Sequence, residues 1–192
     1  APHQSGAFLL RLAKRAPDAP GGQLFLTSQW RDLNETSEVR NPYDGSVIGT
    51  VPSASQADVT AAIDGLTKGA KTMRQMPSHQ RAEILRKTAN LMRERQEELG
   101  RLISTEEGKV LAEGRIEAGR ATETIDLSAD EARRIQGETV PLDSTPGGVG
   151  KLGFTLRVPC GIVAAITPFN YPLNLVAHKA VSNTHLTLPT KA

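Results

Sequence analysis

Near the start of the chain, apolar and polar residues alternate, whereas farther on the apolar residues recur at a period close to 3.6. The stretches QLFLTSQW, from Gln23, and SEVRNPYDGSVIGTVP, from Ser37, are short apolar or alternating runs around an Asn-Pro-Tyr-Asp-Gly turn. Alternation of this kind is typical of strands with one buried face. Within the turn, Asp44 and Gly45 give the backbone the freedom to reverse direction. This region is therefore predicted to form small antiparallel strands.

Three helices are predicted to follow. The first has Ser55 as its N-cap and an apolar face formed by Val59, Ile63, Leu66 and Ala70, and Pro77 marks its end. The second is a single long amphipathic helix over 78–108, because its apolar residues recur at a period close to 3.6. The third covers about 110–135 and closes at Gly137, although its two internal glycines each cost roughly 1 kcal/mol relative to Ala.

Beyond the third helix, the stretches ETVPL and FTLRVP are expected to be extended. The Gly-rich link between them contains GVGKLG, residues 148–153, which matches the G-x-G-x-x-G pattern of dinucleotide-binding loops. In such loops the glycines follow a strand and open a helix. Here they precede the strand-like FTLRV, so the link is predicted to be a plain hairpin loop.

The run GIVAAIT, residues 161–167, is uninterrupted apolar sequence, which is typical of a parallel strand covered on both faces. Pro168 ends this strand, and Pro172 can occupy the first turn of the next helix. The arrangement places Asn170 at the carboxyl end of a strand, where open α/β sheets bind their ligands. An Asn there can donate its side-chain NH₂ to a developing oxyanion. The alternative is a turn-forming Asn with no chemical role.

Composition and charge narrow the class of protein. A length of 192 residues with 38% hydrophobic content suits one globular domain or a piece of a larger one. The net charge is +2, and basic and acidic residues are mixed, which argues against nucleic-acid binding. A single cysteine excludes an internal disulfide, and His and Cys do not come together at metal-ligand spacing. No apolar run approaches the ~20 residues of a membrane span. An intracellular, metal-free protein is expected.

The segment VPCGIVAAITPFNYPLNLVAHK, residues 158–179, resembles the Asn-bearing motif of the NAD(P)-dependent aldehyde dehydrogenase superfamily. The resemblance extends from about Gln23 to Ala180. It implies the N-terminal part of an α/β fold of aldehyde dehydrogenase type: helices plus the start of a parallel Rossmann-type sheet, with an oligomerisation arm. The family mechanism begins when a Cys thiolate attacks the aldehyde to form a thiohemiacetal. Hydride then passes to the nicotinamide of NAD or NADP, and a Glu activates the hydrolytic water.

The resemblance also assigns roles to residues of this chain. It makes Asn170 the oxyanion donor and Lys179, a lysine close to the site, the second expected catalytic residue. The segment lining the cofactor cleft corresponds to Ile166, Thr167, Pro168, Phe169 and Asn170. The substrate tunnel corresponds to Tyr171, Asn174, Leu175 and His178. Polar Asn174 and His178 favour a short polar aldehyde, although a helix-packing role for His178 remains open.

Arg120 and Cys160 are two further residues with a possible chemical role. Arg120 precedes Thr124 and Leu127 at helical spacing and resembles an arginine of family members that act on anionic aldehydes. The alternative is a solvated Arg, or one tied to a neighbouring Glu at position 117 or 123. Cys160 lies ahead of the predicted strand, and the family nucleophile would lie far beyond residue 192, so Cys160 is expected to be structural.

Five segments are expected from these patterns. They are a loose extension at 1–22, the N-terminal part of the cofactor-binding domain at 23–138, arm strands at 139–160, the first strand-turn-helix of the Rossmann-type core at 161–181, and a tail at 182–192. The tail matches nothing in the family motif, so a truncation or frame-shift artefact is expected, with a divergent natural terminus as the alternative.

The function expected of the complete protein is oxidation of a small, polar aldehyde to its acid with NAD or NADP, in the cytoplasm. It is expected to be a homo-oligomer that needs neither nucleic acid nor membrane as partner, while this truncated chain alone is expected to be inactive. Two alternatives remain. The long amphipathic helix would suit a self-standing interaction module, and the AAITPFN strand end would suit a non-catalytic domain that keeps only the cofactor cleft.

Overall fold

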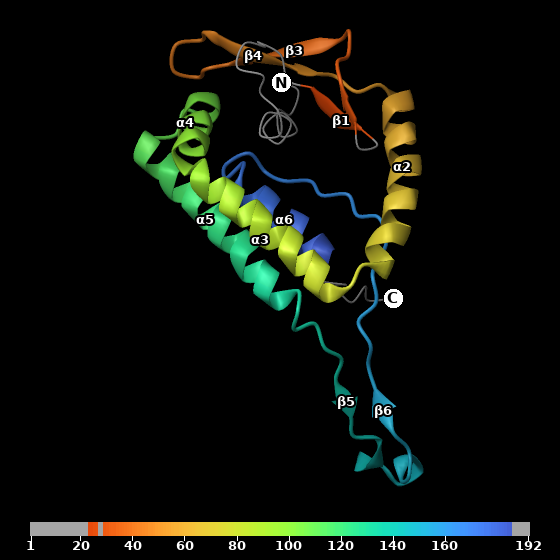
Figure 1. Cartoon of the computed structure of the whole chain (residues 1–192). Helices are drawn as coiled ribbons and strands as arrows, with labels where there is room; N and C mark the ends of the chain where they lie inside the picture. Colours follow the sequence, from red (N-terminus) through yellow and green to blue (C-terminus); the bar gives the residue numbers. More distant parts are fainter. Residues whose placement is uncertain (1–22, 27–28, 186–192) are drawn as a thin grey trace.

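The computed structural model describes residues 23–26 and 29–185 (Figure 1). The expected extension at 1–22 and most of the expected tail, residues 186–192, lie outside the described part. The strands are β1 (Leu24–Leu26), β2 (Gln29–Arg31), β3 (Thr36–Arg40), β4 (Val47–Pro52), β5 (Thr139–Val140) and β6 (Gly153–Phe154). The helices are α2 (Gln56–Gln75), α3 (Ser78–Glu94), α4 (Gln96–Glu107), α5 (Leu111–Glu131) and α6 (Asn174–His185), with 3₁₀ turns η1 (Leu142–Ser144) and η2 (Pro146–Gly148).

The predicted antiparallel strands near the start of the chain are confirmed. Strand β1 pairs with β2, and β3 pairs with β4, in two separate antiparallel hairpins. Gly45 adopts a φ of 73° in the turn between β3 and β4, and its N–H donates to the Asn41 carbonyl at 2.8 Å. The left-handed backbone at this position explains why the turn carries a glycine.

The predicted start of the first helix is also confirmed. The Ser55 hydroxyl accepts a hydrogen bond from the Asp58 N–H at 3.2 Å, and the Asp58 carboxylate accepts one from the Ser55 N–H at 2.9 Å. This capping box satisfies two N–H groups that have no partner inside the helix. The predicted apolar face of α2 is not buried by the described residues, since Val59, Ile63 and Leu66 are 44%, 51% and 52% exposed.

The long helix predicted over 78–108 is two helices. Its direction changes at Arg95, whose φ of −106° and ψ of 14° end α3 and begin α4. The Arg95 guanidinium binds the Glu98 carboxylate at 2.8–2.9 Å. Both helices pack on α5, and the bend allows each to do so. The predicted stop at Gly108 is confirmed, with a φ of 78° and a hydrogen bond from its N–H to the Ser104 carbonyl.

Glycines inside the helices are explained by a close helix crossing. A Cβ on Gly114 would lie 2.5 Å from the Gly100 carbonyl oxygen, and one on Gly100 would lie 2.9 Å from the Arg115 Cα. Helices α4 and α5 therefore touch through their backbones. The predicted end at Gly137 is wrong, because α5 ends at Glu131, and Gly137 instead approaches the Thr155 carbonyl in the following hairpin.

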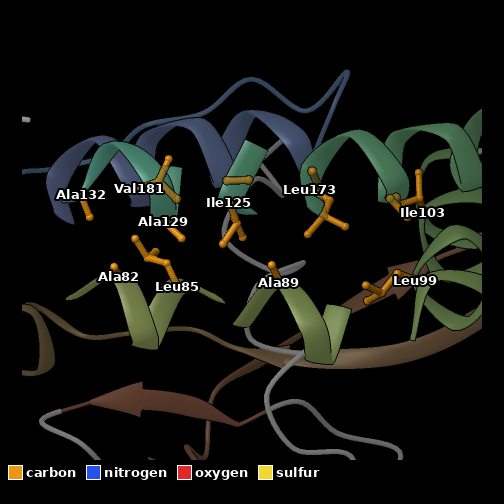
Figure 2. Packing of buried hydrophobic residues seen from close by; sticks show 13 residues of the cluster. Ala82, Leu85, Ala89, Leu99, Ile103, Ile125, Ala129, Ala132, Leu173 and Val181 are labelled. Atoms are coloured by element: carbon orange, nitrogen blue, oxygen red, sulfur yellow. The ribbon is translucent and has the colours of Figure 1, made fainter. Parts of the chain in front are cut away.

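The core lies between α3, α4, α5 and α6 (Figure 2). Its buried apolar residues are Ala82, Leu85, Ala89, Leu99, Ile103, Ala118, Ala121, Ile125, Ala129, Ala132, Leu173, Ala177 and Val181. Many of these are alanines, which allow the helices to pack closely. Figure 2 shows Leu173 pointing into this core between Ile125 and Ile103. Burial of Leu173 therefore fixes the start of α6 against α5.

The stretches ETVPL and FTLRVP form the predicted hairpin. Strand β5 pairs with β6 in antiparallel register, Thr139 opposite Phe154 and Val140 opposite Gly153. The hairpin extends away from the helices, and η1 and η2 lie at its tip (Figure 1). The G-x-G-x-x-G stretch, residues 148–153, lies on this tip and leads into β6, not into a helix, which confirms the hairpin-loop interpretation.

The strand predicted over 161–167 is not formed. This segment belongs to none of the three sheets in the described part of the chain, and Ile162, Val163 and Ile166 are 43%, 46% and 83% exposed. A parallel strand needs a neighbour to complete its hydrogen bonds, and no described segment lies in that position. The helix predicted after it is α6, which begins two residues after Pro172 and continues to His185, past the predicted boundary at residue 181.

Candidate functional site

The candidate site is the turn that joins the 161–167 segment to α6. Asn170 lies in this turn and its side chain is exposed, so its amide is accessible. The turn is held against the rest of the molecule by two charged residues that precede it by more than fifty positions in the sequence, Lys109 and Glu117.

Lys109 lies just before α5 and has several partners. Its Nζ donates to the Asn170 carbonyl at 2.8 Å and to Glu117 Oε2 at 2.7 Å. Glu107 Oε2 lies 3.1 Å from the same nitrogen as an ion pair. The ammonium also lies 4.1 Å from the centroid of the Tyr171 ring, within the range of a cation–π contact. Lys109 thus contacts two successive residues of the turn.

Glu117 connects Lys109 to the start of α6. Its Oε1 accepts hydrogen bonds from the N–H groups of Leu173 at 2.9 Å and Asn174 at 3.2 Å. These donors have no partner inside the helix, and a carboxylate at this end also meets the positive end of the helix dipole. The side chain of Glu117 is only 1% exposed, and its carboxylate oxygens bind Lys109 and these two N–H groups.

The surroundings of Lys109 keep its side chain charged. Burial opposes the charged form of Lys109, but hydrogen bonds and charges from Glu117 and Glu107 outweigh it, so the pKa of Lys109 lies above its ordinary value. Burial raises the pKa of the Glu107 carboxyl, and Lys109 opposes that rise only in part. Lys109 is therefore a permanent cation at neutral pH and holds the turn as a hydrogen-bond donor.

Lys179 makes a second link between α6 and the preceding segment. Its ammonium donates to the Ile166 carbonyl, thirteen residues earlier in the sequence. Ile166 and Pro168 are exposed, whereas Thr167 and Phe169 are half-buried. The residues expected to line a cofactor cleft are consecutive in sequence. Lys179 ties the first of them, Ile166, to α6.

The residues expected to contact substrate do not share one environment. Asn174 is 4% exposed, and the Thr124 hydroxyl contacts its Oδ1 at 3.3 Å, so Asn174 faces α5. Leu175 is half-buried, whereas Tyr171 and His178 are exposed. The structure brings Asn170 and Tyr171 together through Lys109 but places Asn174 in the helix interface.

Arg120 is exposed on α5. The Thr124 hydroxyl donates to the Arg120 carbonyl at 3.0 Å, so Arg120 lies one helical turn before the residue that contacts Asn174. The alternative pairing with Glu117 does not occur, because that carboxylate binds Lys109. Within residues 23–26 and 29–185, Arg120 takes part in no ion pair.

Sequence reasoning missed Lys109 and Glu117 as parts of this site. One signal for Glu117 was present: it falls on the buried face of α5, four residues before Ala121 and eight before Ile125. A charged residue on such a face needs a specific partner. Lys109 carried no comparable signal, because it follows the helix stop at Gly108 like an ordinary loop residue.

Other kinds of site find little support in the described part of the chain. No group of three or more His, Cys, Asp or Glu side chains there is arranged to hold a metal ion. Cys160 is exposed. None of the described helices has the length and apolar character needed to cross a membrane.

Comparison with known proteins adds independent evidence. The chain is 41% identical over 156 residues to 3-sulfolactaldehyde dehydrogenase from Priestia aryabhattai, covering 81% of this chain and 32% of that protein. It is 36% identical over 160 residues to succinate-semialdehyde dehydrogenase [NADP(+)] from Escherichia coli K12, covering 82% and 32%. The chain thus spans about a third of the length of these relatives.

A solved structure agrees with this match. Aldehyde dehydrogenase 21 from Physcomitrella patens, in complex with the reaction product succinate, superposes with a TM-score of 0.82 and 32% identity, over 87% of this chain and 35% of that one. The fold is therefore the N-terminal part of an aldehyde dehydrogenase fold. The sequence pattern of the aldehyde dehydrogenase family matches residues 30–184, and the chain belongs to this family.

Proposed function

We propose that this chain forms part of an NAD(P)-dependent dehydrogenase that oxidises a small, polar aldehyde to its carboxylic acid. The observation that carries the proposal is the exposed Asn170, whose backbone is held by Lys109. The nucleophilic Cys and general-base Glu belong to the part of the protein outside this chain. Residues 1–192 alone are expected to be inactive.

In the proposed reaction, Asn170 stabilises charge on the aldehyde oxygen. Attack by the Cys thiolate turns the carbonyl oxygen into an oxyanion, and a thiohemiacetal forms. The Asn170 side-chain NH₂ donates to this oxygen. A donor already fixed in place needs no reorganisation during the reaction, which makes its contribution larger than that of a free amide in water.

The residues Ile166–Phe169 fit the nicotinamide end of NAD(P). Ile166 is 83% exposed and presents apolar surface suited to a flat ring, and it is adjacent to half-buried Thr167. When bound, the cofactor supplies the hydride acceptor. Lys179 holds the Ile166 carbonyl, so we assign Lys179 to positioning this segment and not to proton transfer.

The proposed substrate is small and polar. Exposed Tyr171 and His178 are candidates for contact with it, while Asn174 supports the site from the helix interface through Thr124. The named relatives act on sulfolactaldehyde and succinate semialdehyde, and each of these molecules carries an anionic group in addition to its aldehyde. An anionic aldehyde is therefore the first substrate class to test.

Arg120 is the proposed anchor for that anionic group. Its guanidinium is exposed and takes part in no ion pair within the described residues, so it is available to bind a carboxylate or sulfonate through two hydrogen bonds. In the full-length enzyme, Arg120→Ala should raise the Michaelis constant for succinate semialdehyde by about tenfold or more but leave that for propanal nearly unchanged. Arg115→Ala, which removes an exposed arginine of the same helix, is the control. An equal rise in the Michaelis constants for both aldehydes would show that Arg120 does not bind the anionic group.

The proposed function is tested by product analysis of the full-length protein. Given succinate semialdehyde and either NAD or NADP, it should form one carboxylate for each reduced cofactor. Cofactor binding without any aldehyde oxidation would favour a non-catalytic cofactor-binding domain. Absence of both, in a folded protein, would favour a helical interaction module.

Assembly and location remain part of the proposal. We propose that the full-length protein is a cytoplasmic homo-oligomer whose copies meet through the β5–β6 hairpin. Four exposed apolar residues around β6 support this assignment: Leu152, Phe154, Leu156 and Val158. Analytical ultracentrifugation of the full-length protein should show more than one copy per particle.

A further inference from the structure

We infer that the ion pair of Lys109 and Glu117 positions the Asn170 amide, so that both are positioning residues of the reaction. The inference rests on the proposed function, because it gives these residues an effect on rate that acts through Asn170.

Lys109 holds the Asn170 end of the turn. Its Nζ donates hydrogen bonds to the Asn170 carbonyl and to Glu117 Oε2, and Glu107 Oε2 lies 3.1 Å away as an ion pair. The side chain is only 11% exposed. Its bond to the Asn170 carbonyl therefore has little competition from water and fixes the peptide that follows the Asn170 Cα.

Glu117 fixes the other end of the turn. Both carboxylate oxygens are used, Oε2 by Lys109 and Oε1 by the N–H groups of Leu173 and Asn174. Since Leu173 is 3% exposed and belongs to the core, this end cannot shift without disturbing the packing of α5 and α6.

Together these contacts restrain the turn at the carbonyl of Asn170 and on its C-terminal side. Lys109 holds residue 170 and lies over the ring of residue 171, while Glu117 holds residues 173 and 174. The Asn170 side chain itself is exposed. Such an arrangement leaves the side-chain amide of Asn170 free to meet a substrate oxygen while Lys109, just before α5, holds the Asn170 carbonyl.

Helix α5 also offers a control pair. Arg115 on α5 binds Glu97 on α4 through two hydrogen bonds of 2.7 Å, and their side chains are 43% and 54% exposed. This pair joins α4 to α5 and has no contact with the 170–174 turn among the described residues. It therefore reports what loss of a charge pair costs without loss of the proposed positioning.

The test uses the full-length enzyme with succinate semialdehyde as substrate. The variant Lys109→Met with Glu117→Gln removes both charges but keeps an oxygen acceptor for the α6 N–H groups. Misplacement of a catalytic group by about 1 Å can lower a rate by 10²-fold. We expect kcat to fall roughly 10- to 100-fold, with the cofactor dissociation constant within about twofold of normal. The control, Arg115→Met with Glu97→Gln, should keep near-normal kcat.

A second comparison separates positioning from general stability. In an Asn170→Ala background, the Lys109 and Glu117 changes should lower kcat by less than about twofold, because the donor that they position is already absent. Losses that multiply would show that the pair acts independently of Asn170 and would overturn the inference. A normal kcat in the Lys109/Glu117 variant would overturn it as well.

Two further outcomes are decisive. If Asn170→Ala itself keeps normal kcat, the proposed role of Asn170 fails and this inference fails with it. If the Lys109/Glu117 variant does not fold while the control does, the same rates are measured for Lys109→Gln, which keeps a donor for Glu117 but is shorter. An unchanged rate in Lys109→Gln, or its failure to fold, would reduce the pair to a stabilising contact and overturn the inference.

Discussion

Replacing Asn170 with Ala in the full-length enzyme should reduce kcat by roughly 10²–10³-fold, the scale seen when one preorganised oxyanion donor is removed. Asn170 has the exposure and the fixed backbone that such a donor requires. Its strongest interaction arises only when negative charge develops on the aldehyde oxygen, so the loss should fall on kcat.

Cofactor affinity should change little in the same variant. Lys109 contacts the backbone carbonyl of Asn170 and not its side-chain amide, so this contact survives the substitution. Equilibrium titration with NAD or NADP and thermal melting, made on the preparation used for the rates, separate chemistry from folding. If Asn170 only shapes the turn, stability and cofactor binding should fall together instead.

The largest expected loss of stability follows from replacing Glu117 with Leu. This change leaves Lys109 beside an apolar side chain and removes the acceptor of the Leu173 and Asn174 N–H groups. Removing one partner of a buried pair costs about 3–5 kcal/mol. Since Lys109 keeps 11% exposure, we expect a loss of about 3 kcal/mol in the free energy of unfolding, measured as a lower urea midpoint.

Two variants control for this loss. Glu117→Gln keeps an acceptor for the α6 N–H groups and should cost clearly less than Glu117→Leu. Glu97→Leu removes an exposed partner of Arg115 and Arg101 and should lower the urea midpoint far less than Glu117→Leu, because water screens an exposed pair. Equal losses for Glu117→Leu and Glu97→Leu would contradict the buried role of Glu117.

Features that depend on neighbours in sequence were predictable. The capping box at Ser55, the left-handed stop at Gly108 and the reversal at Gly45 each rest on the chemistry of a few adjacent residues. The hairpin of β5 and β6 belongs to the same group, because the order of glycines and strand-like residues excluded a nucleotide-binding loop.

Features that depend on distant partners were not. The helical period runs through Arg95 without a Gly or Pro, so the bend between α3 and α4, which comes from packing on α5, left no signal. The apolar run at 161–167 marks a capacity to form a strand, but its ladder needs a neighbour that the described residues do not include. The family resemblance likewise placed Asn174 beside a substrate, whereas Asn174 is buried and contacts Thr124.

The candidate site shows the same division. The place of Asn170 after an apolar run and before Pro172 made it a candidate, and the family resemblance made it the expected oxyanion donor. The group that holds it, Lys109, lies 61 residues earlier. A contact of that separation depends on how α5 and α6 dock, which no local pattern reports.

The most direct test of the central claim is the kcat of an Asn170→Asp variant of the full-length enzyme. This substitution keeps the shape of the side chain but replaces the NH₂ donor with a carboxylate oxygen, which repels an oxyanion. Our account predicts a loss of at least about 10²-fold in the rate of aldehyde oxidation, with unchanged melting temperature and cofactor dissociation constant. A near-normal rate would contradict the account, because no oxyanion donor can be replaced by a negative charge without effect.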